Sequence, residues 1–219
     1  MTDMGSFFSV EGKFYTVTSK MVDMVVITFL WIVGCIPIVT ILTSTASMYH
    51  TTVKCIRYDR GKVFDEFKEA YKKNLKQGIG LTVLYGGIGA VIGFADYYVF
   101  VRSESRTSIM FIWAVAMLML TTLYLINVLW MVPVFSRFAN TFGKILELNF
   151  VISLRYLIRS IPMVLIVVIA AILVYASLPL VIIFPSLFML LISYLSEPVL
   201  HRYMPKQEED NGDWRYGFR

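Results

Sequence analysis

Four stretches of the chain contain no Asp, Glu, Lys or Arg over 18 residues or more, namely 24–53, 78–95, 107–136 and 160–196. The hydrocarbon core of a bilayer is about 30 Å thick, and a helix of about 20 apolar residues crosses it. We therefore expect an all-α integral membrane protein, built as a bundle of transmembrane helices.

The last of these stretches is too long for a single crossing, because its 37 residues would make a helix of about 55 Å. Pro179 and Pro185 lie near its middle. A proline removes a backbone donor and clashes with the preceding helical turn. The sequence therefore predicts two helices here, at about 161–177 and 180–197.

The first stretch has two interpretations, because Gly34 and Pro37 interrupt it. A single kinked helix over 21–43 gives five spans in total and places the N-terminus outside. A hairpin around residues 34–37 gives six spans and places the N-terminus inside. Basic residues before the first span favour the hairpin, but the Thr- and Ser-rich residues after Pro37 make a poor independent span. Five spans are the favoured prediction.

The two remaining spans are expected at about 78–100 and 108–135. Residues 1–200 then form a single transmembrane domain, and residues 201–219 form a polar tail. Orientation follows from charge, since cytoplasmic loops are enriched in Lys and Arg. The loops and tail that would share one side carry 16 basic residues, against two in the short loop on the other side.

This count places the segment 54–76 and the C-terminus in the cytoplasm of a multi-pass cell-membrane protein. The segments 54–76 and 137–159 also have apolar side chains at helical spacing with charges between them. Amphipathic helices of this kind lie at the headgroup boundary. We expect Lys68, Lys72 and Lys73 to face anionic lipid there.

Glycines in the span 78–100 define a candidate contact surface, at Gly78, Gly86, Gly89 and Gly93. Small residues spaced in this way let two helix backbones approach closely within lipid. Two interpretations remain open: this face packs inside the monomer, or it forms a lateral seam with a partner protein.

Composition agrees with a membrane protein, at 58% hydrophobic and 16% charged residues. The chain has two histidines and no catalytic, phosphate-binding or paired-cysteine motif, so we expect no enzyme, no cofactor and no metal site. Cys35 and Cys55 give no support for a disulfide framework. Nucleic-acid binding is disfavoured, because the positive-inside rule already explains the net charge of +5.

Polar residues inside or beside the spans are the remaining candidates for function, since burying them is costly. Asp23, Asp96 and Glu197 lie near predicted boundaries and are interpreted as interfacial or capping carboxylates. Asn127 lies deeper, and we expect it to form a hydrogen bond between helices. The sequence shows no deep charge pair that would bind a substrate or couple an ion.

Residues 37–77, PIVTILTSTASMYHTTVKCIRYDRGKVFDEFKEAYKKNLKQ, resemble the YesL-like family of bacterial membrane proteins, domain of unknown function 624. The matching positions are Leu30, Trp31, Pro37, Ile38, Val39, Thr40, Ile41, Tyr49, Lys54, Arg57, Gly61, Phe64, Phe67, Asn74, Lys76 and Gln77. Leu42 stands where the family pattern has glycine, which puts any bending role of that glycine in doubt.

The resemblance implies which genes lie nearby, and it does not imply a particular reaction or substrate. Similar proteins are typically encoded beside ABC-type importers and hydrolases for complex carbohydrates in Gram-positive bacteria. We therefore expect an accessory or regulatory component that contacts the permease subunits of a sugar ABC importer as well as the lipid bilayer. A small stand-alone transporter and a membrane scaffold for a sensor are the alternatives. The sequence does not give the oligomeric state.

Overall fold

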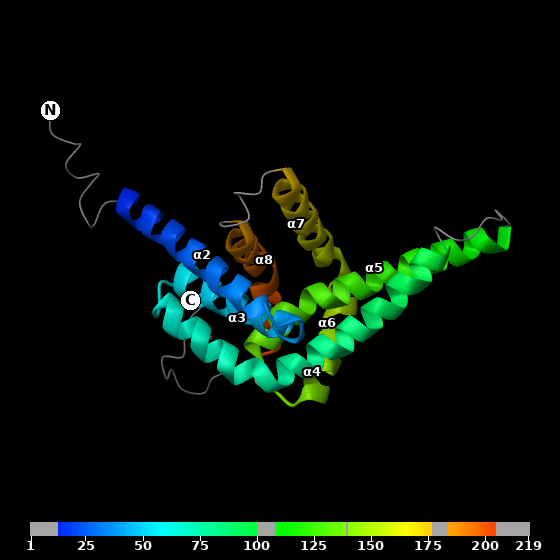
Figure 1. The fold of residues 1–219 in the computed structure, drawn as a ribbon, viewed down its shortest axis with the longest axis horizontal. Coiled ribbons are helices and arrows are strands. Elements are labelled where there is room, and N and C mark those ends of the chain that lie inside the picture. The colour runs from blue at the N-terminus through cyan, green and yellow to red at the C-terminus, as the bar shows by residue number, and fades with distance from the viewer. Residues whose placement is uncertain (1–12, 100–107, 139, 177–183, 205–219) are drawn as a thin grey trace.

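The computed structural model describes residues 13–99, 108–138, 140–176 and 184–204, and within these ranges the chain forms helices and turns without any strand. Figure 1 shows them as an open bundle. The helices are α2 (Lys13–Cys35), η1 (Ile38–Thr40), α3 (Ile41–Thr51), η2 (Thr52–Arg57), α4 (Val63–Tyr97), α5 (Ser108–Arg137), α6 (Phe142–Arg155), α7 (Leu157–Ala176) and α8 (Phe184–Leu200). The all-α prediction is confirmed for this part of the chain.

The chain reverses direction at Pro37, so that α2 and α3 form an antiparallel hairpin. The Thr40 hydroxyl donates to the carbonyl oxygens of Gly34 and Pro37, at 2.8 and 2.7 Å, and so satisfies acceptors left open where the helix ends. At the far end of the hairpin, the Lys20 ammonium donates to the carbonyl oxygen of Ile56 at 3.2 Å. The single helix predicted over 21–43 is therefore wrong, because the chain breaks around residues 34–37, but the additional span that a hairpin would give is not confirmed.

A short turn of left-handed backbone leads from this hairpin into α4. Asp59 has φ of 52° and Gly61 has φ of 84°. A glycine adopts such a φ at little cost, and a short polar side chain tolerates it better than a branched one. The turn brings α4 back along α3, where Gly78 of α4 lies against Thr43.

Helix α4 is continuous over 35 residues, which at 1.5 Å each gives a length of about 52 Å. Residues 63–76 of the expected amphipathic segment and the span expected to begin at residue 78 are thus one helix, whereas residues 54–62 lie in η2 and the following turn. Its first half packs on the α2–α3 hairpin. Its second half runs beside α5, and the pair extends away from the rest of the bundle (Figure 1).

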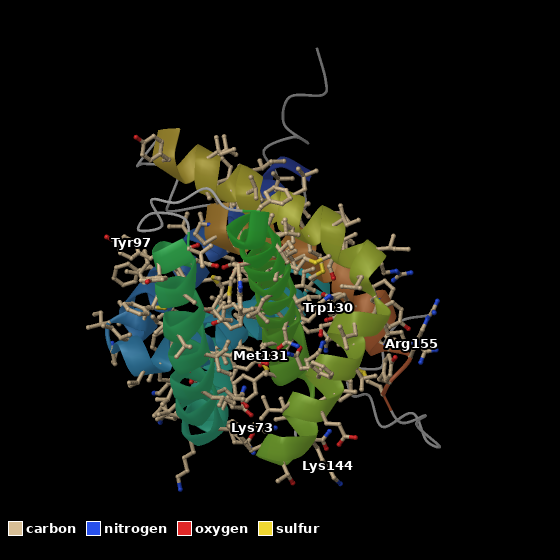
Figure 2. The ribbon with its side chains drawn as sticks, turned by 90° about the vertical axis from the view of Figure 1, so that its right-hand side faces the viewer. Lys73, Tyr97, Trp130, Met131, Lys144 and Arg155 are labelled. Carbon is tan, nitrogen blue, oxygen red and sulfur yellow. The ribbon has the colours of Figure 1, made fainter. Side chains whose placement is uncertain are left out.

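Helices α4 and α5 are antiparallel and are joined by polar contacts along their length. The Thr121 hydroxyl donates to Asp96 at 2.7 Å, and the Tyr124 hydroxyl donates to the carbonyl oxygen of Tyr85 at 2.7 Å. In Figure 2, Lys73 and Tyr97 mark opposite ends of the visible part of α4, with α5 alongside. The Asp96 carboxylate therefore bonds to a neighbouring helix and does not act as a cap.

Helices α6 and α7 meet at a bend of 94° beside Tyr156. Helix α7 then packs against α8, which returns to the ends of α3 and α5. The two helices predicted after residue 160 are present as α7 and α8, and the proposed division at Pro179 lies outside the described residues. Pro185 lies in the first turn of α8, where a missing backbone donor costs little.

Three described helices are long and apolar enough to cross a membrane: Thr16–Cys35, Val63–Tyr97 and Phe111–Arg137. The bent pair α6–α7 adds a fourth if it is counted as one span, and α8 is a shorter apolar helix. The described residues thus form an all-helical structure with three or four helices able to cross a membrane, and five or six spans are not confirmed.

Candidate functional site

The most deeply buried charged groups of the described chain are Arg137, at the end of α5, and Glu197, in α8. Their side chains are 1% and 0% exposed. The Arg137 Nε donates to Glu197 Oε1 at 2.7 Å, and Nη2 donates to Oε2 at 2.5 Å. This two-pronged geometry matches a guanidinium fork to a carboxylate and fixes both distance and orientation.

Helix α3 contributes a third member to this pair. The Tyr49 hydroxyl donates to Glu197 Oε1 at 2.7 Å and lies 2.8 Å from the Ser196 hydroxyl oxygen. Tyr49 and Ser196 are both buried. The network therefore joins α3, α5 and α8 at one point, with polar groups that would be costly to bury one at a time.

Three further groups lie at the edge of this network. The Arg57 guanidinium donates to the carbonyl oxygen of Ser193 at 2.9 Å and lies 4.4 Å from the centroid of the Tyr194 ring. Burial raises the pKa of the Tyr58 phenol to about 12, although the charge of Arg57 acts in the opposite direction. Burial also lowers the pKa of His201, against the effect of Glu197.

Glu197 is therefore not an exposed capping carboxylate, and its charge pair with Arg137, enclosed by protein, was not expected from the sequence. The reason is tertiary. Arg137 and Glu197 lie sixty positions apart and each falls at the end of an apolar run. Only the packing of α8 against α5 brings them together and removes both from water.

A second ion cluster links η2 to the start of α4. The Lys54 ammonium lies 2.5 Å from Glu66 Oε2, and His50 Nε2 lies 3.8 Å from the same oxygen. These side chains are 14–20% exposed. The contact holds the turn between η2 and α4 closed and gives Lys54 a structural role.

A third polar cluster is built from amides and joins α4, α5 and α6. The Tyr85 hydroxyl donates to Asn127 Oδ1 at 2.5 Å, and the Asn127 amide donates to the Ser153 hydroxyl at 2.9 Å. The Asn149 amide donates to Asn127 Oδ1 at 2.9 Å. The expectation that Asn127 forms a hydrogen bond between helices is confirmed.

The positions shared with the YesL-like pattern gather mainly on the α2–α3 hairpin and its contacts. The Trp31 indole donates to the Thr45 hydroxyl at 3.1 Å, and Phe67 is buried against the hairpin. Pro37 and Thr40 form its turn, and Arg57 ends it. Asn74 is partly exposed on α4. Most of these positions therefore build the hairpin and hold α4 to it.

The four glycines of the candidate contact surface have different surroundings. A Cβ on Gly78 would lie 2.0 Å from the Thr43 hydroxyl oxygen, and one on Gly89 would lie 2.5 Å from the Tyr124 hydroxyl oxygen. A Cβ on Gly86 or Gly93 would meet nothing within 4 Å. Gly78 and Gly89 thus face internal neighbours, whereas Gly86 and Gly93 face open space.

An apolar groove lies over Gly86 and its neighbour Gly87, with a volume of about 520 Å³. Its walls come from η1 and α3, from α4 and from α5. They are Ile38, Val39, Ile41, Leu42, Thr45, Thr82, Val83, Tyr85, Gly86, Gly87, Tyr124, Val128, Met131 and Val132. Figure 2 shows Met131 on the α4 side of α5 and Trp130 turned towards α6 and α7. The groove is named here the α4–α5 groove.

Within the part of the chain that the structure describes, no three His, Cys, Asp or Glu side chains come together as a possible metal site.

The three lysines expected to face lipid, Lys68, Lys72 and Lys73, are exposed on the first half of α4. Their contact with lipid stays a prediction.

The class that the described residues define is an all-helical protein with apolar helices able to cross a membrane. Residues 24–97 match the family described as "Protein of unknown function, DUF624". The match covers α3 and η2 together with most of α2 and α4, and it confirms the resemblance recognised in residues 37–77. No curated protein and no solved structure matches the chain.

Proposed function

We propose that this protein is a non-enzymatic accessory or regulatory subunit of an ABC-type importer of complex carbohydrates or oligosaccharides. In this proposal it sits in the cell membrane with the segment 54–76 and the C-terminus in the cytoplasm, and it contacts the permease subunits within the bilayer. The family resemblance supports the importer setting, and the α4–α5 groove supplies a surface for the contact.

The observation that carries the proposal is the open groove over Gly86 and Gly87. Its lining is almost wholly apolar, and no described side chain fills the space above Gly86. In lipid, helices associate mainly by close packing, and glycine removes the bulk that keeps backbones apart. A transmembrane helix of a partner could therefore approach α4 here more closely than at any leucine-covered face.

In this reading the Arg137–Glu197 pair is structural. Both side chains are enclosed, and together with Tyr49 the pair connects three helices, α3, α5 and α8. A buried pair with matched hydrogen bonds fixes one arrangement of the helices, because any shift would separate two desolvated charges.

The second candidate function is a small stand-alone transporter, and the same ion pair favours it. Charged groups within membrane segments often mark substrate or ion pathways. The pair also removes one argument that the sequence gives for an accessory role, namely the absence of paired charges. The pair's nearly complete burial argues against a substrate path in this conformation, so the accessory role remains the proposal.

Copurification together with transport in liposomes separates the two candidates. A tagged protein should bring down a permease or its ATPase, and Gly86→Leu should reduce the recovered permease at least tenfold. Gly143→Leu is the matched control, because a Cβ at Gly143 also meets nothing within 4 Å and Gly143 lies outside the groove. Solute uptake by the purified protein alone, with no permease recovered, would overturn the proposal in favour of the transporter.

A further inference from the structure

A second groove lies between α2 and the first half of α4, and it combines apolar walls with two basic side chains. Its volume is about 490 Å³, within the roughly 300–1,000 Å³ that ligand pockets occupy. Leu30 and Val33 lie on the α2 side, and Phe64 and Leu75 lie near the two ends of the α4 side. This space is named here the α2–α4 groove.

The shape of the α2–α4 groove suits a long apolar chain. Phe64 and Leu75 are eleven positions apart on one face of α4, which corresponds to about 17 Å at 1.5 Å per residue. The α2 wall is also apolar where it carries Leu30 and Val33. A slot of this length between two helices can hold an extended acyl chain along its axis.

Two lysines line the same groove. Lys68 and Lys72 are four positions apart, so they lie on the same side of α4. The Lys68 ammonium lies 5.9 Å from the centroid of the Phe64 ring, which places its charge beside the apolar wall. Both side chains are exposed, and neither takes part in an ion pair with any described residue. Their charges are therefore available to a ligand.

We infer that the α2–α4 groove binds one anionic diacyl phospholipid, with an acyl chain between α2 and α4 and the phosphate beside Lys68 and Lys72. The apolar walls alone would accept the chain of any lipid. Two adjacent positive charges add selectivity for an anionic headgroup. The inference concerns a site for one lipid molecule, which is different from diffuse attraction to a charged membrane surface.

Native mass spectrometry of the purified protein in detergent tests this inference, with phosphatidylglycerol or phosphatidylcholine added in turn. We expect one phosphatidylglycerol molecule to stay bound and phosphatidylcholine to bind more weakly. One basic residue near an anionic headgroup contributes about fivefold in affinity, so the double variant Lys68→Gln/Lys72→Gln should lose about 30-fold. Lys73→Gln is the matched control, because Lys73 is exposed on the same helix but does not line the groove.

A second pair of variants tests the acyl-chain part of the site without changing charge. Val33 and Ile32 are 46% and 42% exposed on α2, and only Val33 lines the groove. Val33→Trp should therefore displace the lipid, and Ile32→Trp should retain it. Equal binding of the two lipids, or an equal loss in Lys73→Gln, would overturn the inference. The measurement needs no permease, so it can fail without affecting the proposed function.

Discussion

The guanidinium of Arg137 and the carboxylate of Glu197 share two hydrogen bonds, of 2.7 and 2.5 Å, in a place where both side chains are almost fully enclosed. Tyr49 adds a third hydrogen bond to the same carboxylate. Because the three side chains come from α5, α8 and α3, this contact fixes how the last helix of the described chain meets the earlier ones.

Removing one partner of this pair should destabilise the protein strongly. In Glu197→Ala, the charge of Arg137 stays buried without its carboxylate partner. Removing one partner of a buried ion pair lowers the free energy of unfolding by about 3–5 kcal/mol. We expect a clear fall in the thermal unfolding temperature in detergent. The double variant Arg137→Leu/Glu197→Leu should be less destabilised than the sum of the two single changes, since no charge is then left behind.

Glu69→Gln is the control for this experiment, because Glu69 is an exposed carboxylate on α4. It should leave the unfolding temperature unchanged within error. A Glu197→Ala protein as stable as Glu69→Gln would show that the Arg137–Glu197 contact is not held in the folded protein.

Two glycines of α4 should respond in opposite directions to the same substitution. Gly78→Ala places a Cβ 2.0 Å from the Thr43 hydroxyl oxygen and 3.2 Å from the Thr43 Cα, so the helices must separate and stability should fall. Gly86→Ala meets open space, and alanine is favoured over glycine inside a helix by about 0.5–1 kcal/mol. Thermal unfolding of the two purified variants measures the contrast. The reverse order of stabilities would contradict the packing of α4 on α3.

The α2–α3 hairpin predicts that the start of α2 and the turn before α4 lie on the same side of the membrane. The Lys20 ammonium lies 2.8 Å from the Asp59 carboxylate. Single cysteines replacing Ser19 and Lys62, both exposed, should react with a membrane-impermeant maleimide from the same side of sealed vesicles. The natural cysteines are replaced by serine in both variants. Labelling of the two positions from opposite sides would contradict the hairpin and support a single continuous first helix.

Cys55 should be unreactive in the folded protein. Burial raises the pKa of its thiol to about 12, and the thiolate is the reactive form. A raised pKa favours the neutral thiol, so at pH 8 only about 1 thiol in 10,000 is ionised, and reactivity should increase only as the pH approaches 12. In a Cys35→Ser background, maleimide labelling at pH 8 should be slow, and unfolding in detergent should make it fast. Equal rates would show that Cys55 is accessible.

The sequence predicted the helical class because long uncharged runs have few alternatives to membrane helices. It left a break at Pro37 only as the alternative to a kinked helix, because a proline does not always end a helix: Pro133, Pro162 and Pro198 all lie inside helices. It did not predict that α4 would be continuous through residues 76–78, because a change from amphipathic to apolar composition does not require the backbone to break.

The buried network was missed for a different reason. Arg137 fits the positive-inside pattern and Glu197 sits near a predicted helix end, so each has a local explanation that conceals the tertiary contact. The glycine pattern was visible in the sequence, but spacing alone does not distinguish Gly78, which packs against Thr43, from Gly86, which faces the α4–α5 groove.

Photo-crosslinking from the α4–α5 groove tests the proposed accessory role most directly. Val83 lines the groove and is 60% exposed, and Ile161 on α7 is 68% exposed but lies outside it. A photoreactive amino acid at position 83, introduced in cells that express the importer, should give a product that contains a permease subunit. The same amino acid at position 161 should not. Absence of a permease product at position 83, or equal products at both positions, would contradict the account.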